Sequence, residues 1–165
     1  MSDPQPYFRE APSVDDLSDY QRGFFSSLVS ILERLHPAKL DRNQSVAELS
    51  DGTLSIELQH ADDPDTWIVV LVDDEIYFSP PTPPPPEQAD MGLGSDTANG
   101  LELVEAALSG RLALDVKRKG CEIVLLRMLI RATDGSYRDA GGWKRSWPPT
   151  LTKAETLRYT PPAFT

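Results

Sequence analysis

Residues 66–78 constrain the fold more than any other stretch. The run 67–72 holds six apolar residues, four β-branched and one aromatic, which is too short for a buried helix and typical of a strand covered on both faces. Asp73 and Asp74 follow as a two-residue turn, because Asp tolerates left-handed backbone angles. Ile76 and Phe78 then alternate with polar neighbours. The stretch therefore predicts an antiparallel hairpin at the centre of the core.

A helix and two further strands are expected before this hairpin. Ser13 is a suitable N-cap, Asp15 and Asp16 suit the positive end of a helix dipole, and Pro37 ends the helix. Apolar residues then recur every three or four positions, at Leu17, Tyr20, Phe24, Leu28, Ile31 and Leu35. Strands at 46–49 and 54–58 flank an Asp51-Gly52 turn, and Ser55, Glu57 and Gln59 face solvent. The prediction is an N-terminal amphipathic helix followed by a four-stranded antiparallel meander.

The second half begins with a proline tract. Residues 80–94 are expected to form a mobile Pro-rich loop, either a spacer or a ligand for an aromatic groove. A second helix is expected from residue 95 or 96 to Gly110, and then a C-terminal antiparallel hairpin that joins the same sheet. Because no helix separates each pair of strands, the predicted class is α+β.

The chain length suits a single domain. At 165 residues we expect a flexible N-terminal tail (1–12), a single α+β domain (13–140) and an irregular C-terminal segment rich in Gly, Pro and Trp (141–165). Residues 1–12 lack the pattern of a signal peptide, and no apolar run approaches the ~20 residues that span a bilayer. Cys121 is the single cysteine, and its place at the start of a strand predicts a buried thiol. A cytoplasmic location without membrane contact is the expectation.

Charge is distributed unevenly. Residues 111–165 carry 11 basic and 5 acidic residues, a net charge of +6; subtraction from the chain totals of 16 and 26 leaves 5 basic and 21 acidic residues in 1–110, a net charge of −16. An acidic body repels nucleic acid and attracts basic partners. The basic C-terminal residues are interleaved with the aromatic residues Tyr137, Trp143 and Trp147. We interpret this basic part as the complement of the acidic part, in the same molecule or in a second copy. We do not expect nucleic-acid binding.

Searches for catalytic and metal-binding patterns leave one alternative site. No cysteine or histidine pair has zinc spacing, and no nucleophile elbow or dinucleotide loop is present, so we expect no metal and no cofactor. His60 shares strand parity with buried residues and precedes Asp62, Asp63 and Asp65. These four residues could supply acid–base chemistry in a cavity between helix and sheet, as a small enzyme or ligand-binding domain would require.

The favoured interpretation is a non-enzymatic binding or inhibitory protein. Acidic residues cluster on two turns of the meander, at Asp51, Asp73, Asp74 and Glu75, and predict a surface for a basic protein partner. In size, acidity and helix-then-meander order, the chain resembles immunity proteins that neutralise bacterial toxins. A secretion chaperone or scaffold subunit that forms a homodimer through residues 121–131 is an alternative within the same class.

Overall fold

The computed structural model describes residue 4, residues 6–145 and residues 155–165. In chain order, the elements are η1 (Val14–Asp16), α1 (Asp19–Leu35), β1 (Val46–Ser50), β2 (Thr53–Gln59), β3 (Trp67–Val72), β4 (Ile76–Ser79), β5 (Met91–Gly92), α2 (Thr97–Leu108), β6 (Leu112–Lys119), β7 (Glu122–Arg131), β8 (Tyr137–Lys144) and β9 (Leu157–Tyr159). Two α-helices and two antiparallel sheets in the described chain make an α+β fold, which confirms the predicted class.

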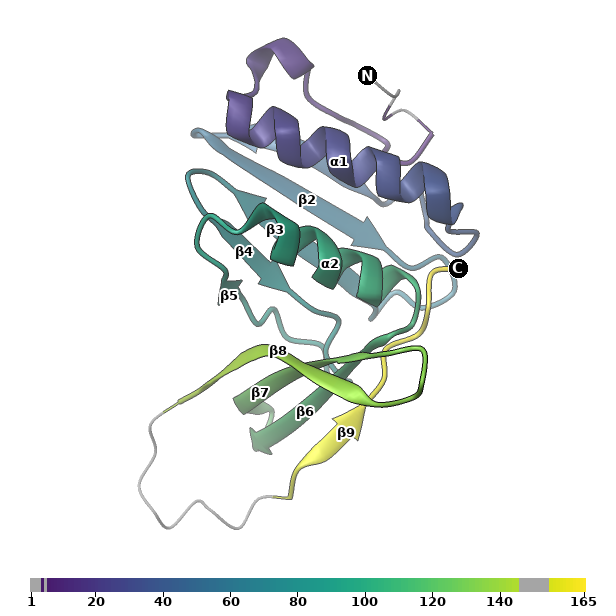
Figure 1. The fold of residues 1–165 in the computed structure, drawn as a ribbon, viewed down its shortest axis with the longest axis vertical. Helices are drawn as coiled ribbons and strands as arrows, with labels where there is room; N and C mark the ends of the chain where they lie inside the picture. The colour runs from purple at the N-terminus through teal and green to yellow at the C-terminus, as the bar shows by residue number, and fades with distance from the viewer. Residues whose placement is uncertain (1–3, 5, 146–154) are drawn as a thin grey trace.

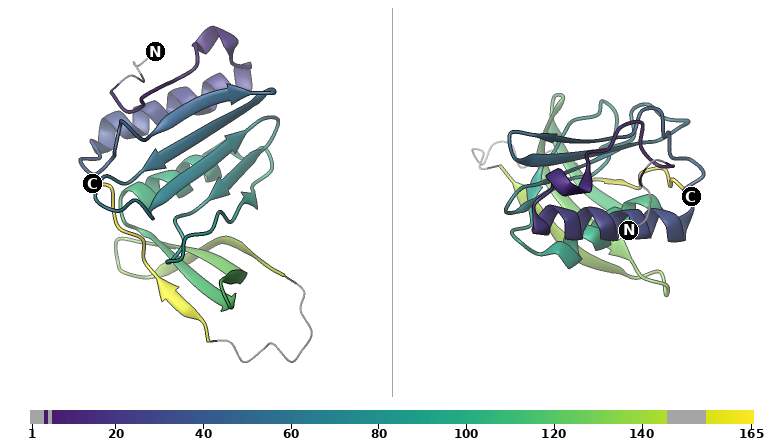
Figure 2. Two further views of the ribbon diagram at one scale, coloured as in Figure 1. Left: turned by 180° about the vertical axis from the view of Figure 1, so that it is seen from behind. Right: turned by 90° about the horizontal axis from the view of Figure 1, so that it is seen from above.

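The first sheet is an antiparallel meander in the order β1-β2-β3-β4-β5. The four predicted strands form, and β5 adds a short fifth. One buried residue from each strand lies in a row across the sheet: Ala47, Ile56, Val70, Phe78 and Met91. Both helices cover this face, so the core lies between helices and sheet (Figures 1 and 2).

Helix α1 begins later than its apolar spacing predicts. Ser13 caps the short η1 turn, and Leu17 has extended backbone angles. The helix starts at Asp19, because Ser18 and Gln21 form a capping box that satisfies two N–H groups at its first turn. It ends at His36, whose left-handed φ of 46° precedes Pro37.

Helix α2 packs against α1 and β4 through a glycine. A Cβ atom on Gly100 would lie 3.2 Å from Ile76 and 3.3 Å from Phe24, which is tighter than ordinary contact. The absence of a side chain at Gly100 therefore lets the two helices lie side by side on one face of the sheet (Figure 1).

The C-terminal strands form a second sheet, in the order β8-β7-β6-β9, instead of joining the first. The outer edge of β4 is already occupied by β5, and β6 pairs with β9. The hairpin therefore packs its buried residues, such as Leu114 and Met128, against the body of the molecule. Part of segment 141–165 is regular, since β8 continues to Lys144 and β9 adds an edge strand, while Phe164 near the C-terminus is fully buried.

The proline tract packs closely, which its composition did not indicate. Residues 80–83 are buried. The Arg118 guanidinium donates to the carbonyl oxygens of Pro83 at 2.6 Å and Pro85 at 2.8 Å, and Glu87 accepts the N–H of Ile123 at 2.9 Å. Prolines lack an N–H but keep a free carbonyl, so an arginine donor suits them. The tract connects the two sheets rather than standing away from them.

The N-terminal segment also makes contacts that were not expected of a flexible tail. Phe8 is buried, and its ring centroid lies 5.7 Å from that of Phe25. Ala47 donates its N–H to the carbonyl oxygen of Glu10 at 2.9 Å, so residues 9–10 lie along the outer edge of β1. The apolar ring of Phe8 explains the attachment, because its burial removes aromatic surface from water.

Candidate partner-binding surfaces

The two turns predicted to bind a partner lie at one end of the first sheet. Leu54 pairs with Val72, so the β1–β2 turn and the β3–β4 turn are neighbours (Figure 1). Asp51 has a φ of 50° and Gly52 a φ of 81°, the left-handed angles that a tight hairpin turn requires. The structure brings the four predicted residues together, and all are exposed: Asp51, Asp73, Asp74 and Glu75.

The side chain of Gln21 ties both turns to the start of α1. Gln21 is 3% exposed, and its Nε2 donates to the carbonyl oxygens of Gly52 and Val72, at 2.8 Å each. Its Oε1 accepts the backbone N–H of Ser18 at 3.1 Å. Both polar atoms of the amide are engaged, so the turns are held against the helix.

Four further acidic residues lie at this end, because both helices begin there (Figure 1). They are Asp15, Asp16, Asp19 and Asp96. Gly94, just before the N-cap of α2, accepts the N–H of Ile76 beside the β3–β4 turn. We call these eight residues the acidic end. Acidic residues at helix starts are visible in the sequence, but only the tertiary structure reveals that these starts meet the two turns.

Few of the negative charges of the acidic end are paired with basic side chains. Within the described residues, its one recorded ion pair joins Asp19 to Arg22 at 3.5 Å. The pKa of Tyr77 is raised above its ordinary value of 10.0, first by the negative charge of Glu75 and then by the hydrogen bond that Tyr77 donates to that carboxylate. Asp73 adds a smaller contribution. The end therefore carries a negative electrostatic potential.

The alternative site around His60 is occupied by backbone groups. His60 is 6% exposed; its Nδ1 accepts the N–H of Asp62 at 3.2 Å, and its Nε2 lies 3.0 Å from the carbonyl oxygen of Ala163. The ring meets Phe164 edge-on, with centroids 5.1 Å apart. Both nitrogens are engaged: Nδ1 within the β2–β3 connection, and Nε2 with the C-terminal segment, which it joins to that connection.

The carboxylates beside His60 also have local partners. Asp62 pairs with Lys39, whose hydrogen bond and charge hold the pKa of Asp62 below its ordinary value. Asp63 accepts the N–H of Asp65 at 3.1 Å and the hydroxyl of Thr66 at 2.8 Å. Among the described residues, no three His, Cys, Asp or Glu side chains form a group that could hold a metal ion.

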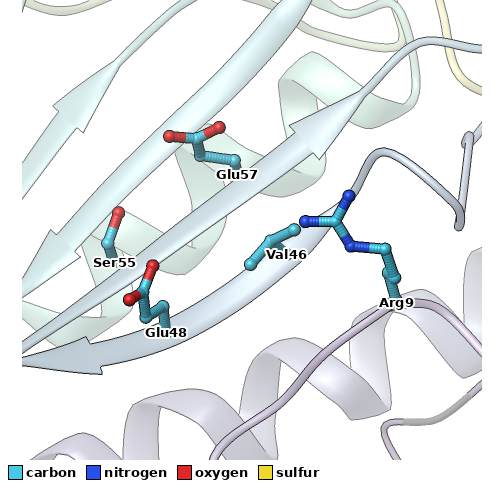
Figure 3. Close-up of a pocket in the computed structure, with 5 residues that line it drawn as sticks. All are labelled: Arg9, Val46, Glu48, Ser55 and Glu57. Atoms are coloured by element: carbon cyan, nitrogen blue, oxygen red, sulfur yellow. The ribbon is translucent and has the colours of Figure 1, made fainter.

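A hollow on the opposite side of the first sheet was not identified from the sequence. It has a volume of about 200 Å³ and is lined by Arg9, Val46, Glu48, Ser55 and Glu57 (Figure 3). The alternation of β2 correctly predicts that Ser55 and Glu57 face away from the core. The contribution of Arg9 could not be predicted, because it depends on residues 9–10 lying along β1.

Several basic residues of the second sheet pair with carboxylates. Arg127 and Asp139 lie 2.8 Å apart. Further ion pairs are Arg138–Glu102, Arg145–Glu122 and Arg158–Asp115. Of these four pairs, only Arg138–Glu102 joins the basic part to residues 1–110, and the other three lie within residues 111–165. Most of these contacts therefore do not join the basic part to the acidic part, as the charge distribution had suggested. Trp147 lies outside the described residues. Cys121 is exposed in the β6–β7 turn, so the prediction of a buried thiol is wrong: the strand begins one residue later.

Comparisons with protein families, with curated proteins and with solved structures find no match. Over the described residues, neither helix combines the length and apolarity that crossing a membrane requires.

Proposed function

We propose that this chain is a non-enzymatic binding or inhibitory protein that recognises a basic protein partner through the acidic end. The observation that carries the proposal is the convergence of two hairpin turns and two helix starts, all acidic, at one end of the fold. Clustered carboxylates repel one another and add nothing to the core, so their concentration favours an external role. An immunity-like or secretion-chaperone-like protein fits this description.

Such a surface acts mainly on the rate of association. Long-range attraction steers a basic partner toward the acidic end, and salt weakens it as the Debye length falls from about 10 Å at 0.1 M to about 3 Å at 1 M. A second copy of this chain carries the same negative end, so like charges disfavour a homodimer through it.

The test is a quantitative pull-down from native lysate at low and high salt. The variant Asp51→Asn, Asp73→Asn, Asp74→Asn removes three charges while its side-chain oxygens still support both turns; Asp73, for example, accepts the N–H of Glu75 at 2.8 Å. The matched control Asp65→Asn, Asp90→Asn, Glu155→Gln removes three charges from exposed positions outside the acidic end.

We expect basic proteins to be retained at low salt by wild type and control, and to be lost by the acidic-end variant. The retained protein is then purified, and its association rate should fall with salt and with the variant. Equal retention by all three proteins, or retention by none, would contradict the proposal.

A further inference from the structure

The outer face of the first sheet, opposite the helices, is not covered by any helix of the described chain (Figure 2, left). Strand register places its side chains in two long rows. The first row is Val46, Glu57, Val69 and Ser79. The second row is Glu48, Ser55, Leu71, Tyr77 and Gly92. The face is therefore acidic along β1 and β2 and apolar along β3 and β4.

The apolar half is continuous and partly accessible. Trp67, Leu71 and Tyr77 are half-buried, and Val69 between them is 4% exposed. Ala89 donates its N–H to the hydroxyl oxygen of Ser79 at 2.8 Å, so the proline-rich segment closes one margin of this band. The remaining band presents two aromatic rings and an aliphatic side chain to solvent.

The acidic half holds the hollow described above. Glu48 and Glu57 project from the same side of the sheet as the guanidinium of Arg9 (Figure 3). Across the described residues, neither glutamate lies within ion-pair distance of a basic group, and Arg9 is paired with Glu10 at 3.5 Å. Two carboxylates and the Ser55 hydroxyl thus face a space that an ammonium or guanidinium group could enter.

We propose that this face binds a segment of a partner protein that carries a Lys or Arg side chain and an apolar side chain about 10 Å apart. Two strand spacings of about 4.8 Å separate the middle of the β1–β2 pair from the middle of the β3–β4 pair, which sets that distance. The cation enters the hollow between Glu48 and Glu57, and the apolar group covers Leu71 and Tyr77. The site adjoins the acidic end at Tyr77, which donates a hydrogen bond to Glu75, but it shares no residue with that end, so either proposal can fail alone.

Charge complementarity favours such a partner over a second copy of this chain. The hollow carries two carboxylates against the one guanidinium of Arg9, which is already paired. A second copy placed face to face would desolvate the glutamates of both copies without supplying a new cation, and burial of unpaired charge is costly. A partner segment with its own Lys or Arg supplies the missing cation to the acidic half, and its apolar side chain covers the apolar half.

The experiment selects peptides from a random library displayed on phage, using the immobilised full-length chain. Three baits are compared: wild type; Glu48→Gln, Glu57→Gln; and Asp51→Asn, Asp73→Asn, Asp74→Asn. The glutamines preserve side-chain shape at exposed positions, and thermal melting verifies that each bait is folded. The most enriched peptide is then titrated into labelled protein, with nuclear magnetic resonance shifts as the readout.

We expect enriched peptides to combine Lys or Arg with aromatic or aliphatic residues and to shift the signals of Trp67, Leu71 and Tyr77. Glu48→Gln, Glu57→Gln should weaken binding about fivefold, equivalent to about 1 kcal/mol, and the acidic-end variant should bind as wild type does. The proposal is overturned if no peptide is enriched, if only purely basic peptides are enriched, or if Glu48→Gln, Glu57→Gln leaves the affinity unchanged. Sedimentation that reveals a dimer broken by Leu71→Arg also overturns it, because the face would then contact a second copy.

Discussion

At the scale of single residues, two buried polar side chains, Gln21 and His60, hold parts of the fold together. Gln21 bonds to carbonyl oxygens on two turns, one of them 51 residues away. His60 contacts the carbonyl oxygen of a residue 103 positions away. Both side chains are buried with their hydrogen bonds made, which is the condition under which a polar group is tolerated in a core.

Gln21→Ala should destabilise the fold by about 2 to 3 kcal/mol, because it leaves the buried carbonyl of Val72 without its donor and removes half of the capping box. Thermal denaturation should record a fall of roughly 5 to 10 °C in the melting temperature. Ser30→Ala, on the exposed side of the same helix, is the control and should change the stability by less than about 0.5 kcal/mol. An equal effect of the two changes would argue against the role of Gln21.

Acid sensitivity can be assigned to particular carboxylates. The pKa of Asp139 lies below its ordinary value of 3.8, first because it accepts the N–H of Gly141 and then because Arg127 bonds to it. A carboxyl group whose pKa is lower in the folded state than in the unfolded state stabilises the fold at pH values above its ordinary pKa. This contribution is lost as the pH falls through the folded-state pKa.

Asp139→Asn should therefore be less stable than wild type at about pH 7, and the difference should shrink as the pH falls through the folded-state pKa of Asp139, which lies below its ordinary value of 3.8. Urea unfolding midpoints across this range measure it; the effect is small because the side chain is exposed. Glu155→Gln, for which no partner among the described residues is recorded, is the control. A difference between wild type and Asp139→Asn that persists in acid would contradict the assignment.

At the scale of elements, β3 has two faces that serve different purposes. Val70 and Val72 point into the core and are fully buried, whereas Trp67 and Leu71 are half-buried on the outer face. The continuous apolar run correctly predicts a central strand, but it does not distinguish a strand covered on both sides from one with a partly open side.

Val70→Asp should prevent folding, because an unpaired charge in this core costs several kcal/mol. Leu71→Asp, one residue later on the outer face, should remain folded with a lower melting temperature. Far-ultraviolet circular dichroism and the cooperativity of melting separate the two outcomes. If the Val70 variant melts cooperatively and the Leu71 variant does not, the assignment of the two faces is reversed.

At the scale of the whole molecule, two segments without regular structure join the sheets. The proline-rich segment contacts the β6–β7 hairpin through Arg118 and Glu87. The C-terminal segment inserts Phe164, whose N–H donates to the carbonyl oxygen of Leu108 at 2.9 Å. The proline tract, whose composition predicts a mobile loop, is therefore expected to matter for stability.

Arg118→Ala should lower the stability by about 2 kcal/mol, since one guanidinium serves the carbonyl oxygens of Pro83, Pro85 and Cys121. Hydrogen exchange should also accelerate at the amides of Glu87 and Ile123, which fasten the same contact. Lys117→Ala, at a neighbouring half-exposed position, is the control. Unchanged exchange at both amides would mean that the segment is held by apolar packing alone.

The sequence by itself determined the local elements. Residues 46–79 form the meander that their alternation and turn residues predict, because strand periodicity and turn angles depend on neighbours in the chain. The four acidic residues of its two turns were predictable for the same reason, since adjacent hairpins of a meander place alternate turns at one end.

Only the tertiary structure decided which elements meet. The second sheet depends on β5 occupying the edge of β4, and the hollow depends on Arg9 lying along the outer edge of β1. The packed proline tract depends on an arginine 35 residues from Pro83. Contacts over such separations depend on how the side chains of two distant elements pack against each other. A pattern confined to one stretch of the sequence therefore cannot predict them.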